Sequence, residues 1–350
     1  MSTTLDAPRT IPVGPTRGTR LKRALLGRDA AIVVLLVVVY LIGYTTVPYF
    51  AGPTTIAFLL LDVLPILLIA LPMTLIIITG EIDLSVASTL GLSSVLVGVL
   101  FQAGWSIPAA AAVAVVVGIA AGALNGFLIT TVGLPSLAVT VGTLALYRGI
   151  AVGLLGTNAI TGFPPEWQAV VTTRLGGDNS PFPAILLLFV VLAALFIVVL
   201  HFTPVGRAIY AAGLNDEAAA FSGVDTGRLT FWLYVASGLL SAVAGVLWTL
   251  QYNSARGDNA LGLELSVVAA VLVGGVSIFG GRGALPGVIA AVLTIGVLRS
   301  VLRLANVTDD VINVVTGALL IASVLLPRLF AGLGALRHRA ASRPRRAAHS

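Results

Sequence analysis

Two carboxylates, Glu81 and Asp83, stand in the stretch TGEIDLSVAS between two long apolar runs. Ionised side chains inside a membrane are costly, so they usually face a bundle interior or water and often mark a pathway. A carboxylate is also a strong acceptor for the hydroxyl groups of a solute. Two interpretations follow. The favoured one is that Asp83 caps the next helix and bonds between helices; the other is that the acids line a solute path.

Further polar side chains inside apolar segments extend this candidate set. Asn125 is expected either to bond across helices or to touch a solute. Arg148 is expected to pair with Asp62 of an earlier segment, or to bond a solute hydroxyl if it faces a pore. The possible solute path therefore comprises Glu81, Asp83, Asn125, Thr143 and Arg148.

Several kinds of catalytic chemistry are not expected. The chain has no cysteine and three histidines, two of them near the C-terminus, which argues against a metal site. Lys22 is the only lysine and has no Gly-Lys-Ser/Thr pattern around it, so a Walker A nucleotide site is excluded. No Ser-His-Asp set suggests itself, and we expect a chain without cofactor or enzymatic activity of its own.

The composition indicates a membrane protein. Hydrophobic residues make up 58% of the chain, charged residues 10%, and the mean hydropathy is +1.05, whereas soluble proteins carry about 25% charged residues. Apolar segments of about 18–25 residues can each cross a bilayer. The sequence predicts an all-α polytopic bundle of about ten transmembrane helices, near residues 30–48, 55–79, 84–103, 107–131, 135–155, 182–202, 229–252, 262–279, 284–304 and 309–330.

Basic residues are concentrated in the two tails, 1–29 and 331–350, and not in a patch suited to nucleic acid. Basic flanks beside membrane spans indicate the cytoplasmic side and contact with lipid headgroups. Both tails are therefore expected in the cytoplasm, with a membrane domain at 30–330 between them. Because successive spans cross the membrane in alternating directions, the loop 203–228 and the turn 280–283 are expected inside, and the loops 156–181 and 253–261 outside.

Glycine positions predict close packing at two places. Gly118, Gly122 and Gly126 form a double GxxxG, which favours tight helix contact within one bundle, with a dimer seam as the alternative. The stretch GGVSIFGG at 274–281 predicts a closely packed or broken eighth span. A re-entrant element is a further possibility there, since irregular backbone is tolerated where protein or water covers it.

The inner loop carries the signals of a short exposed helix. Asn215 is a good N-cap, and Asp216 and Glu217 lie in the first turn, where the helix dipole favours acids. Gly223 can supply the left-handed residue that ends the helix. Such a short helix is marginal alone in water, so either its own bundle or a partner protein must hold it.

Four motifs in order resemble the permeases of monosaccharide-type ATP-binding cassette (ABC) importers, whose members serve ribose, xylose, arabinose, rhamnose and autoinducer 2. GRAIYAAGLNDEAAAFSGV looks like the family's ATPase-coupling loop, and TGEIDLSVAS looks like its GGIDLS signature, with Glu81 where glycine is common. The segments 124–151 and 267–298 also match. The likeness covers about residues 30–330, and the GGVSIFGG form is closer to rhamnose or autoinducer-2 permeases than to ribose ones.

The resemblance implies a role and partners. Two permease chains, identical or different, form the path in the bacterial inner membrane, two ABC ATPases lie beneath them, and a periplasmic or lipid-anchored sugar-binding protein delivers the solute. Import, and not export, is implied by the resemblance alone. It assigns ATPase coupling to Gly206, Arg207, Asn215, Asp216, Glu217, Ala218, Ala219, Ser222 and Gly223.

Two other classes compete with this interpretation. A secondary transporter of a small polar solute, driven by an ion gradient, usually carries acids or histidines midway through its spans. Here the few candidate acids, Asp62, Glu81, Asp83 and Glu264, lie near predicted span ends. A membrane scaffold without transport activity would leave the capped inner loop unexplained.

Overall fold

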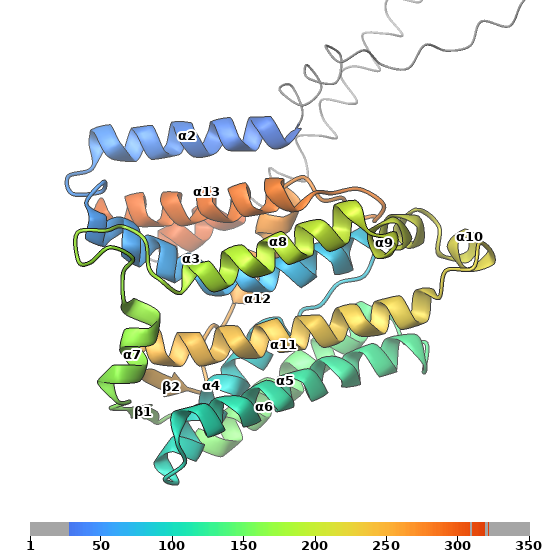
Figure 1. Ribbon diagram of the computed structural model, residues 1–350, viewed down its shortest axis with the longest axis horizontal. Coiled ribbons are helices and arrows are strands. Elements are labelled where there is room, and N and C mark those ends of the chain that lie inside the picture. Colours follow the sequence, from blue (N-terminus) through green and yellow to red (C-terminus); the bar gives the residue numbers. More distant parts are fainter. Residues whose placement is uncertain (1–27, 309, 319–320, 322–350) are drawn as a thin grey trace, which may run out of the picture.

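The computed structural model describes residues 28–308, 310–318 and 321, and it is built almost entirely of helices (Figure 1). The expected tails 1–29 and 331–350 lie outside the described residues, apart from the start of the first helix at Arg28. Most of the expected span 309–330 also lies outside them, although residues 310–318 are helical.

The elements follow one another with short connections. In chain order they are α2 (Arg28–Thr46), α3 (Pro53–Ile78), α4 (Val86–Gln102), α5 (Ile107–Thr130), α6 (Ser136–Leu155), β1 (Ala159–Thr161), α7 (Pro165–Thr172), α8 (Leu186–Phe202), α9 (Pro204–Leu214), α10 (Asp216–Phe221), α11 (Thr226–Tyr252), β2 (Ser254–Arg256), α12 (Leu263–Val273) and α13 (Leu285–Leu304).

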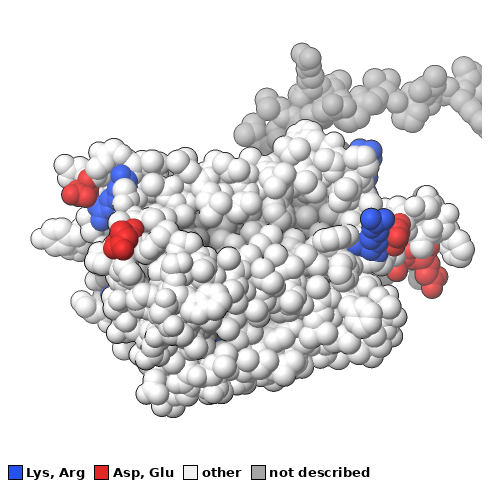
Figure 2. Space-filling model, turned by 60° about the horizontal axis from the view of Figure 1, so that its bottom comes forward, with Lys and Arg blue, Asp and Glu red and all other residues white. Residues whose placement is uncertain are grey.

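This architecture confirms a helical membrane protein. Among the described residues, five helices are long and apolar enough to cross a bilayer: α3, α5, α6, α11 and α13. The pair α8 and α9 would add a sixth, bent by 67°. On the face shown in Figure 2, charged side chains gather at the two ends of the long axis and leave an uncharged belt between them. The expected number of ten crossings stays a prediction.

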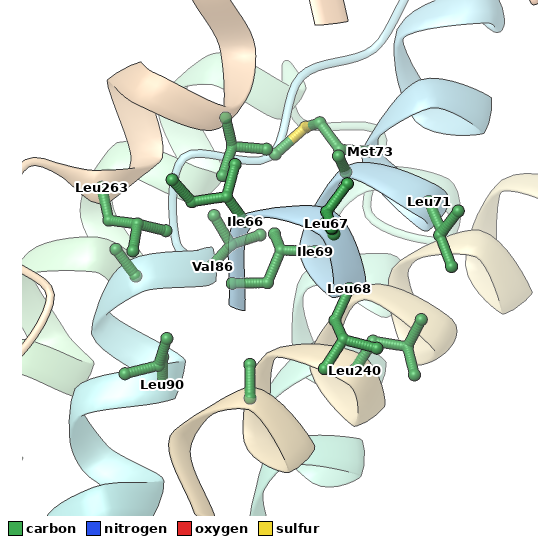
Figure 3. Close-up of a cluster of buried hydrophobic side chains, with 14 of the residues drawn as sticks. Ile66, Leu67, Leu68, Ile69, Leu71, Met73, Val86, Leu90, Leu240 and Leu263 are labelled. Carbon is green, nitrogen blue, oxygen red and sulfur yellow. The ribbon is translucent and has the colours of Figure 1, made fainter. Parts of the chain in front are cut away.

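Helix α3 forms the centre of the bundle. From Leu61 to Ile78 almost every side chain is buried, because the helix is apolar on all sides and packs against α8, α11, α12 and α13. Figure 3 shows its side chains clustered with Val86 and Leu90 of α4, Leu240 of α11 and Leu263 of α12. Pro65 and Pro72 lie inside this helix without ending it.

The double GxxxG packs within the bundle, as the favoured interpretation predicts. A Cβ on Gly118 would meet the carbonyl oxygen of Gly238 on α11 at 2.7 Å, and one on Gly122 would collide with the Tyr234 carbonyl. A Cβ on Gly126 would lie 3.0 Å from the Phe231 ring. These glycines therefore let α5 and α11 approach backbone to backbone, and the alternative of a dimer seam is wrong for this face.

The expected eighth span, 262–279, is not one helix. α12 ends at Val273, and the following glycines adopt positive φ, +95° at Gly275 and +79° at Gly280. Gly274 also lies against the backbone of Val288, because a Cβ on Gly274 would be only 2.5 Å from the Cα of Val288. The sequence offered close packing and a break as alternatives for this stretch, and the structure shows both; a re-entrant element stays a prediction.

The loops gather at two opposite ends of the bundle (Figure 1). At one end β1 pairs antiparallel with β2, joining loop 156–181 to loop 253–261. At the other end α9 contacts the turn after α12, because Tyr210 Oη donates to Gly283 O at 2.7 Å. The same turn contacts the end of α3, where Gly281 N donates to Ile78 O at 2.8 Å. Loops that the predicted order of membrane crossings places on the same side of the membrane thus lie at the same end of the bundle.

Candidate functional site

The linker between α3 and α4 is the polar centre of the bundle. Gly80, at φ +91°, ends the helical path, and residues 81–85 lie outside any helix, so their backbone groups need partners from elsewhere. The Ile82 carbonyl accepts from Tyr234 Oη at 3.0 Å and from Thr140 Oγ1 at 3.3 Å. Its N–H donates to Ser136 Oγ at 3.3 Å. Helices α6 and α11 therefore hold this linker.

Asp83 is buried, with 2% of its surface exposed. One carboxylate oxygen accepts from the Ser85 amide at 3.0 Å and the Ser85 hydroxyl at 2.7 Å. The other accepts from Ser237 Oγ on α11 at 2.7 Å. The predicted bond between helices is confirmed. The prediction that Asp83 is the N-cap of the next helix is wrong in detail, because that position is held by Ser85 and Asp83 orders it from two residues earlier.

Asn125 belongs to the same network. It is 1% exposed, and its Nδ2 donates to Ser85 Oγ at 2.8 Å. Tyr147 Oη approaches Asn125 Oδ1 at 3.4 Å and donates to Ala121 O at 2.9 Å. The expected bond across helices is therefore present. Thr143 is also buried, and its hydroxyl donates within its own helix to Val139 O at 3.0 Å.

The two acids of the opening motif differ in their surroundings. Glu81 is half-buried, and its side chain forms no hydrogen bond or ion pair with the described residues. Asp83, two residues later, is buried and accepts three hydrogen bonds. The geometry gives Asp83 an architectural function. A role for Glu81, Asp83, Asn125, Thr143 or Arg148 in a solute path stays a prediction.

The expected pair between Arg148 and Asp62 is wrong. The Arg148 guanidinium donates to Gly257 O and Asn259 O, each at 2.8 Å, and to Ala87 O at 3.1 Å. It therefore ties α6 to the loop 253–261 and to the start of α4. Three backbone carbonyls accept from the terminal nitrogens of Arg148, and Asp62 instead bonds Tyr252 and Gln251.

The loop between α8 and α11 contains two helices where one was expected. The helix starting at Asp216 is confirmed: Asn215 Oδ1 accepts from Ala218 N at 2.9 Å, and Gly223 has φ +88°. Helix α9 was missed, although Thr203 before Pro204 is a start signal, with Oγ1 accepting from Gly206 N at 3.4 Å.

Most of the residues proposed for ATPase coupling are solvent-exposed on this loop. Gly206 and Ala219 are buried, whereas the exposed members are Arg207, Asn215, Asp216, Glu217, Ala218, Ser222 and Gly223. Phe221 was not among the predicted residues, yet 94% of its surface is exposed at the end of α10. An aromatic residue exposed to this extent on a short capped helix suits a protein contact.

Glycines seat this loop on the bundle. A Cβ on Gly206 would collide with the Leu200 carbonyl, and one on Gly213 would collide with the Ile78 carbonyl at the end of α3. The contact at Gly213 places α9 directly on the helix that leads into the Asp83 linker. Any movement of α9 therefore reaches α3 through backbone contacts and not through flexible side chains.

Comparison with known proteins agrees with this architecture. A family described as the permease component of a branched-chain amino acid transport system matches residues 55–324. The autoinducer 2 import system permease protein LsrD of Klebsiella pneumoniae is 33% identical over 306 residues, covering 86% of this chain and 91% of the relative. The LsrD proteins of Escherichia coli O157:H7 and Yersinia enterocolitica are each 34% identical, over 309 and 270 residues. These alignments cover 87% and 75% of this chain, and 92% and 80% of the relatives.

No solved structure gives a significant match. The family match and the relatives cover the same membrane domain that carries the four motifs. The relatives are named as permease subunits of an import system, so a transport function without enzymatic activity accords with them. The chain belongs to the permeases of ABC importers, in the monosaccharide-type branch that its motifs indicated.

Proposed function

We propose that this chain carries a small monosaccharide or a related polyhydroxylated solute, such as autoinducer 2, into a bacterial cell across the inner membrane. Three named relatives serve autoinducer 2 import and align over 75–87% of this chain. In this proposal a second permease chain completes the path, identical or related, and a periplasmic or lipid-anchored binding protein supplies the solute. The membrane domain is residues 30–330, with ten crossings and both tails in the cytoplasm.

The observation that carries the proposal is the exposed loop 203–228. Its helix α10 stands out from one end of the bundle (Figure 1), and Phe221 is 94% exposed there. We assign this surface to an ABC ATPase, with Phe221 entering a groove on the partner and Asp216 and Glu217 at the rim. The loop connects directly to α3 and α11, so movement of the ATPase has a route into the bundle.

Co-purification from the native host tests the coupling assignment. The tagged wild type should bring down an ABC ATPase, identified by mass spectrometry, and Phe221→Ala should lose most of it. The matched control is Phe182→Ala, an exposed phenylalanine in the loop before α8, at the other end, 55% exposed. Equal retention of the ATPase by both variants would refute the docking role of Phe221.

A second pair of variants isolates the end of α10. Gly223 and Gly176 have similar positive φ, +88° and +82°, and neither has an atom within 4 Å of a built Cβ. An Asp at either position carries similar backbone strain, but only Gly223 lies in the loop 203–228. Gly223→Asp should release the ATPase, whereas Gly176→Asp should keep it. Release by both would show a general folding defect instead.

Uptake assays test the solute. A deletion strain complemented with this chain should accumulate autoinducer 2 or a labelled monosaccharide, and lose that uptake without the ATPase. The printed description of the matched family names branched-chain amino acids, so labelled leucine belongs in the same panel. Uptake of leucine alone would refute the proposed substrate class but not the importer assignment. Family membership leaves the alternative driven by an ion gradient without support.

A further inference from the structure

A cavity of about 350 Å³ lies between α3, α11, α12 and α13, away from the Asp83 network. It lies at the end of the bundle opposite the loop 203–228, because it is lined by the start of α3 and the ends of α11 and α13. Its walls combine aliphatic side chains with a few polar groups, which is the usual make-up of a small-molecule site.

One wall of the cavity holds a carboxylate with hydrogen-bonding capacity left. Asp62 accepts from Tyr252 Oη at 2.8 Å and Gln251 Nε2 at 3.2 Å, and its other oxygen lies 3.5 Å from Arg303 Nη1. A carboxylate offers about four acceptor positions, and the Asp62 side chain is 38% exposed. It can therefore accept a further bond from a hydroxyl group in the cavity.

The other walls supply an aromatic face and donors. The rings of Trp248 and Tyr252 lie 4.8 Å apart at 52° and both line the cavity. Flat rings offer a surface against which the C–H face of a pyranose or furanose can stack. Ser300 and the guanidinium groups of Arg299 and Arg303 line the same space and can donate to ring or hydroxyl oxygens.

We propose that this cavity, lined by Asp62, Trp248, Tyr252, Ser300 and Arg303, is a binding site for a neutral polyhydroxylated solute on the outer side of each permease chain. The inference rests on the proposed function for the identity of the solute and the orientation of the chain. An acceptor, several donors and an aromatic face around a space of this size match a five- or six-carbon solute.

The absence of cysteine from the chain gives a clean test of access and binding. In Ser300→Cys, a membrane-impermeant maleimide added to intact cells should label the single thiol, whereas Ser222→Cys in the loop 203–228 should stay unlabelled. D-ribose, L-rhamnose and autoinducer 2 are the competitors. The solute that the wild type imports should slow labelling of Ser300→Cys at least threefold. If the rate of maleimide labelling of Ser300→Cys is unchanged in the presence of that solute, the proposal is overturned.

Uptake by conservative variants gives the second readout. Asp62→Asn keeps the shape but removes the charge, and should lower uptake at least tenfold and abolish protection of the Ser300→Cys thiol. Its matched control is Asp258→Asn at the same end. There Arg256 donates two bonds at 2.8 Å, which lower the pKa of the Asp258 carboxyl. The control should keep uptake within twofold of wild type, and uptake by Asp62→Asn at the level of this control would overturn the proposal.

Folding and importer assembly are controlled separately. Asp62→Asn must still co-purify with the ATPase, and Tyr252→Phe, which removes only one donor to Asp62, should give a smaller loss of uptake. If the wild type brings down no ATPase, the importer proposal fails. If assembly and uptake are normal but the imported solute leaves the Ser300→Cys thiol unprotected, the cavity proposal alone fails.

Discussion

The bond between Asp83 and Ser237 can be tested by comparing two serines on the same helix. Ser237 and Ser241 are one turn apart on α11, and both are fully buried. Ser237 Oγ donates to the Asp83 carboxylate at 2.7 Å, whereas Ser241 Oγ has no hydrogen-bond partner among the described residues. Ser237→Ala and Ser241→Ala remove the same atom and change helix propensity equally, so their difference isolates the bond.

The structure sets the expected size of that difference. A hydrogen bond to a charged group contributes about 1.5–3 kcal/mol to stability, whereas bonds between helices in membranes average about 0.6 kcal/mol. We expect Ser237→Ala to cost about 1.5–3 kcal/mol, because its partner is a buried carboxylate. Ser241→Ala should be neutral or slightly stabilising, since it removes a buried hydroxyl that lacks a partner.

The assay is SDS titration of the purified chain in mixed micelles, followed by the fluorescence of its four tryptophans. Asp83→Ala should cost about 3–5 kcal/mol, because three donors from Ser85 and Ser237 lose their acceptor. In that background Ser237→Ala should cost almost nothing more. Equal destabilisation by Ser237→Ala and Ser241→Ala would refute the assigned bond.

Glycine contacts give two further predictions. Gly238→Ala should destabilise the chain by about 1–3 kcal/mol, because its Cβ would collide with the Gly118 carbonyl on α5. The control Gly142→Ala, with no atom within 4 Å, should stabilise its helix by about 0.5–1 kcal/mol, and both are read by the same titration. Gly213→Ala should reduce ATP-driven uptake more than it reduces stability, because its Cβ would push α9 off the Ile78 carbonyl. Uptake that falls only in proportion to stability would contradict this.

Local signals predicted the short helix of the loop 203–228 correctly. The N-cap bond of Asn215 spans three residues, and the left-handed Gly223 ends the same helix. Both features depend on the chain's immediate neighbours, so a single sequence contains them. Helix α9 has a local signal of the same kind, because Thr203 caps its start and Pro204 is its first residue.

Hydrogen-bond partners that are far apart in the chain could not be predicted from the sequence. Asp83 and Ser237 are 154 residues apart, and no spacing rule connects them. The partner of Arg148 was predicted wrongly because a cation was matched to the nearest plausible carboxylate. Carbonyls of Gly257 and Asn259 in the loop 253–261, and of Ala87 in the first turn of α4, accept from the Arg148 guanidinium instead.

Two helices connect the proposed ATPase surface to the proposed solute cavity. α3 runs from the cavity at Asp62 to the α9 contact at Ile78, and α11 runs from the end of the loop 203–228 to Tyr252 in the cavity. At 27 residues α11 is about 40 Å long. Between these ends, Asp83 fixes the α3–α4 linker to Ser237. If a movement of the loop 203–228 tilted α11 about this fixed point, the two ends of α11 would move in opposite directions. Tyr252, at the far end, would then move relative to Asp62. The buried carboxylate thus need not touch solute to be essential for transport.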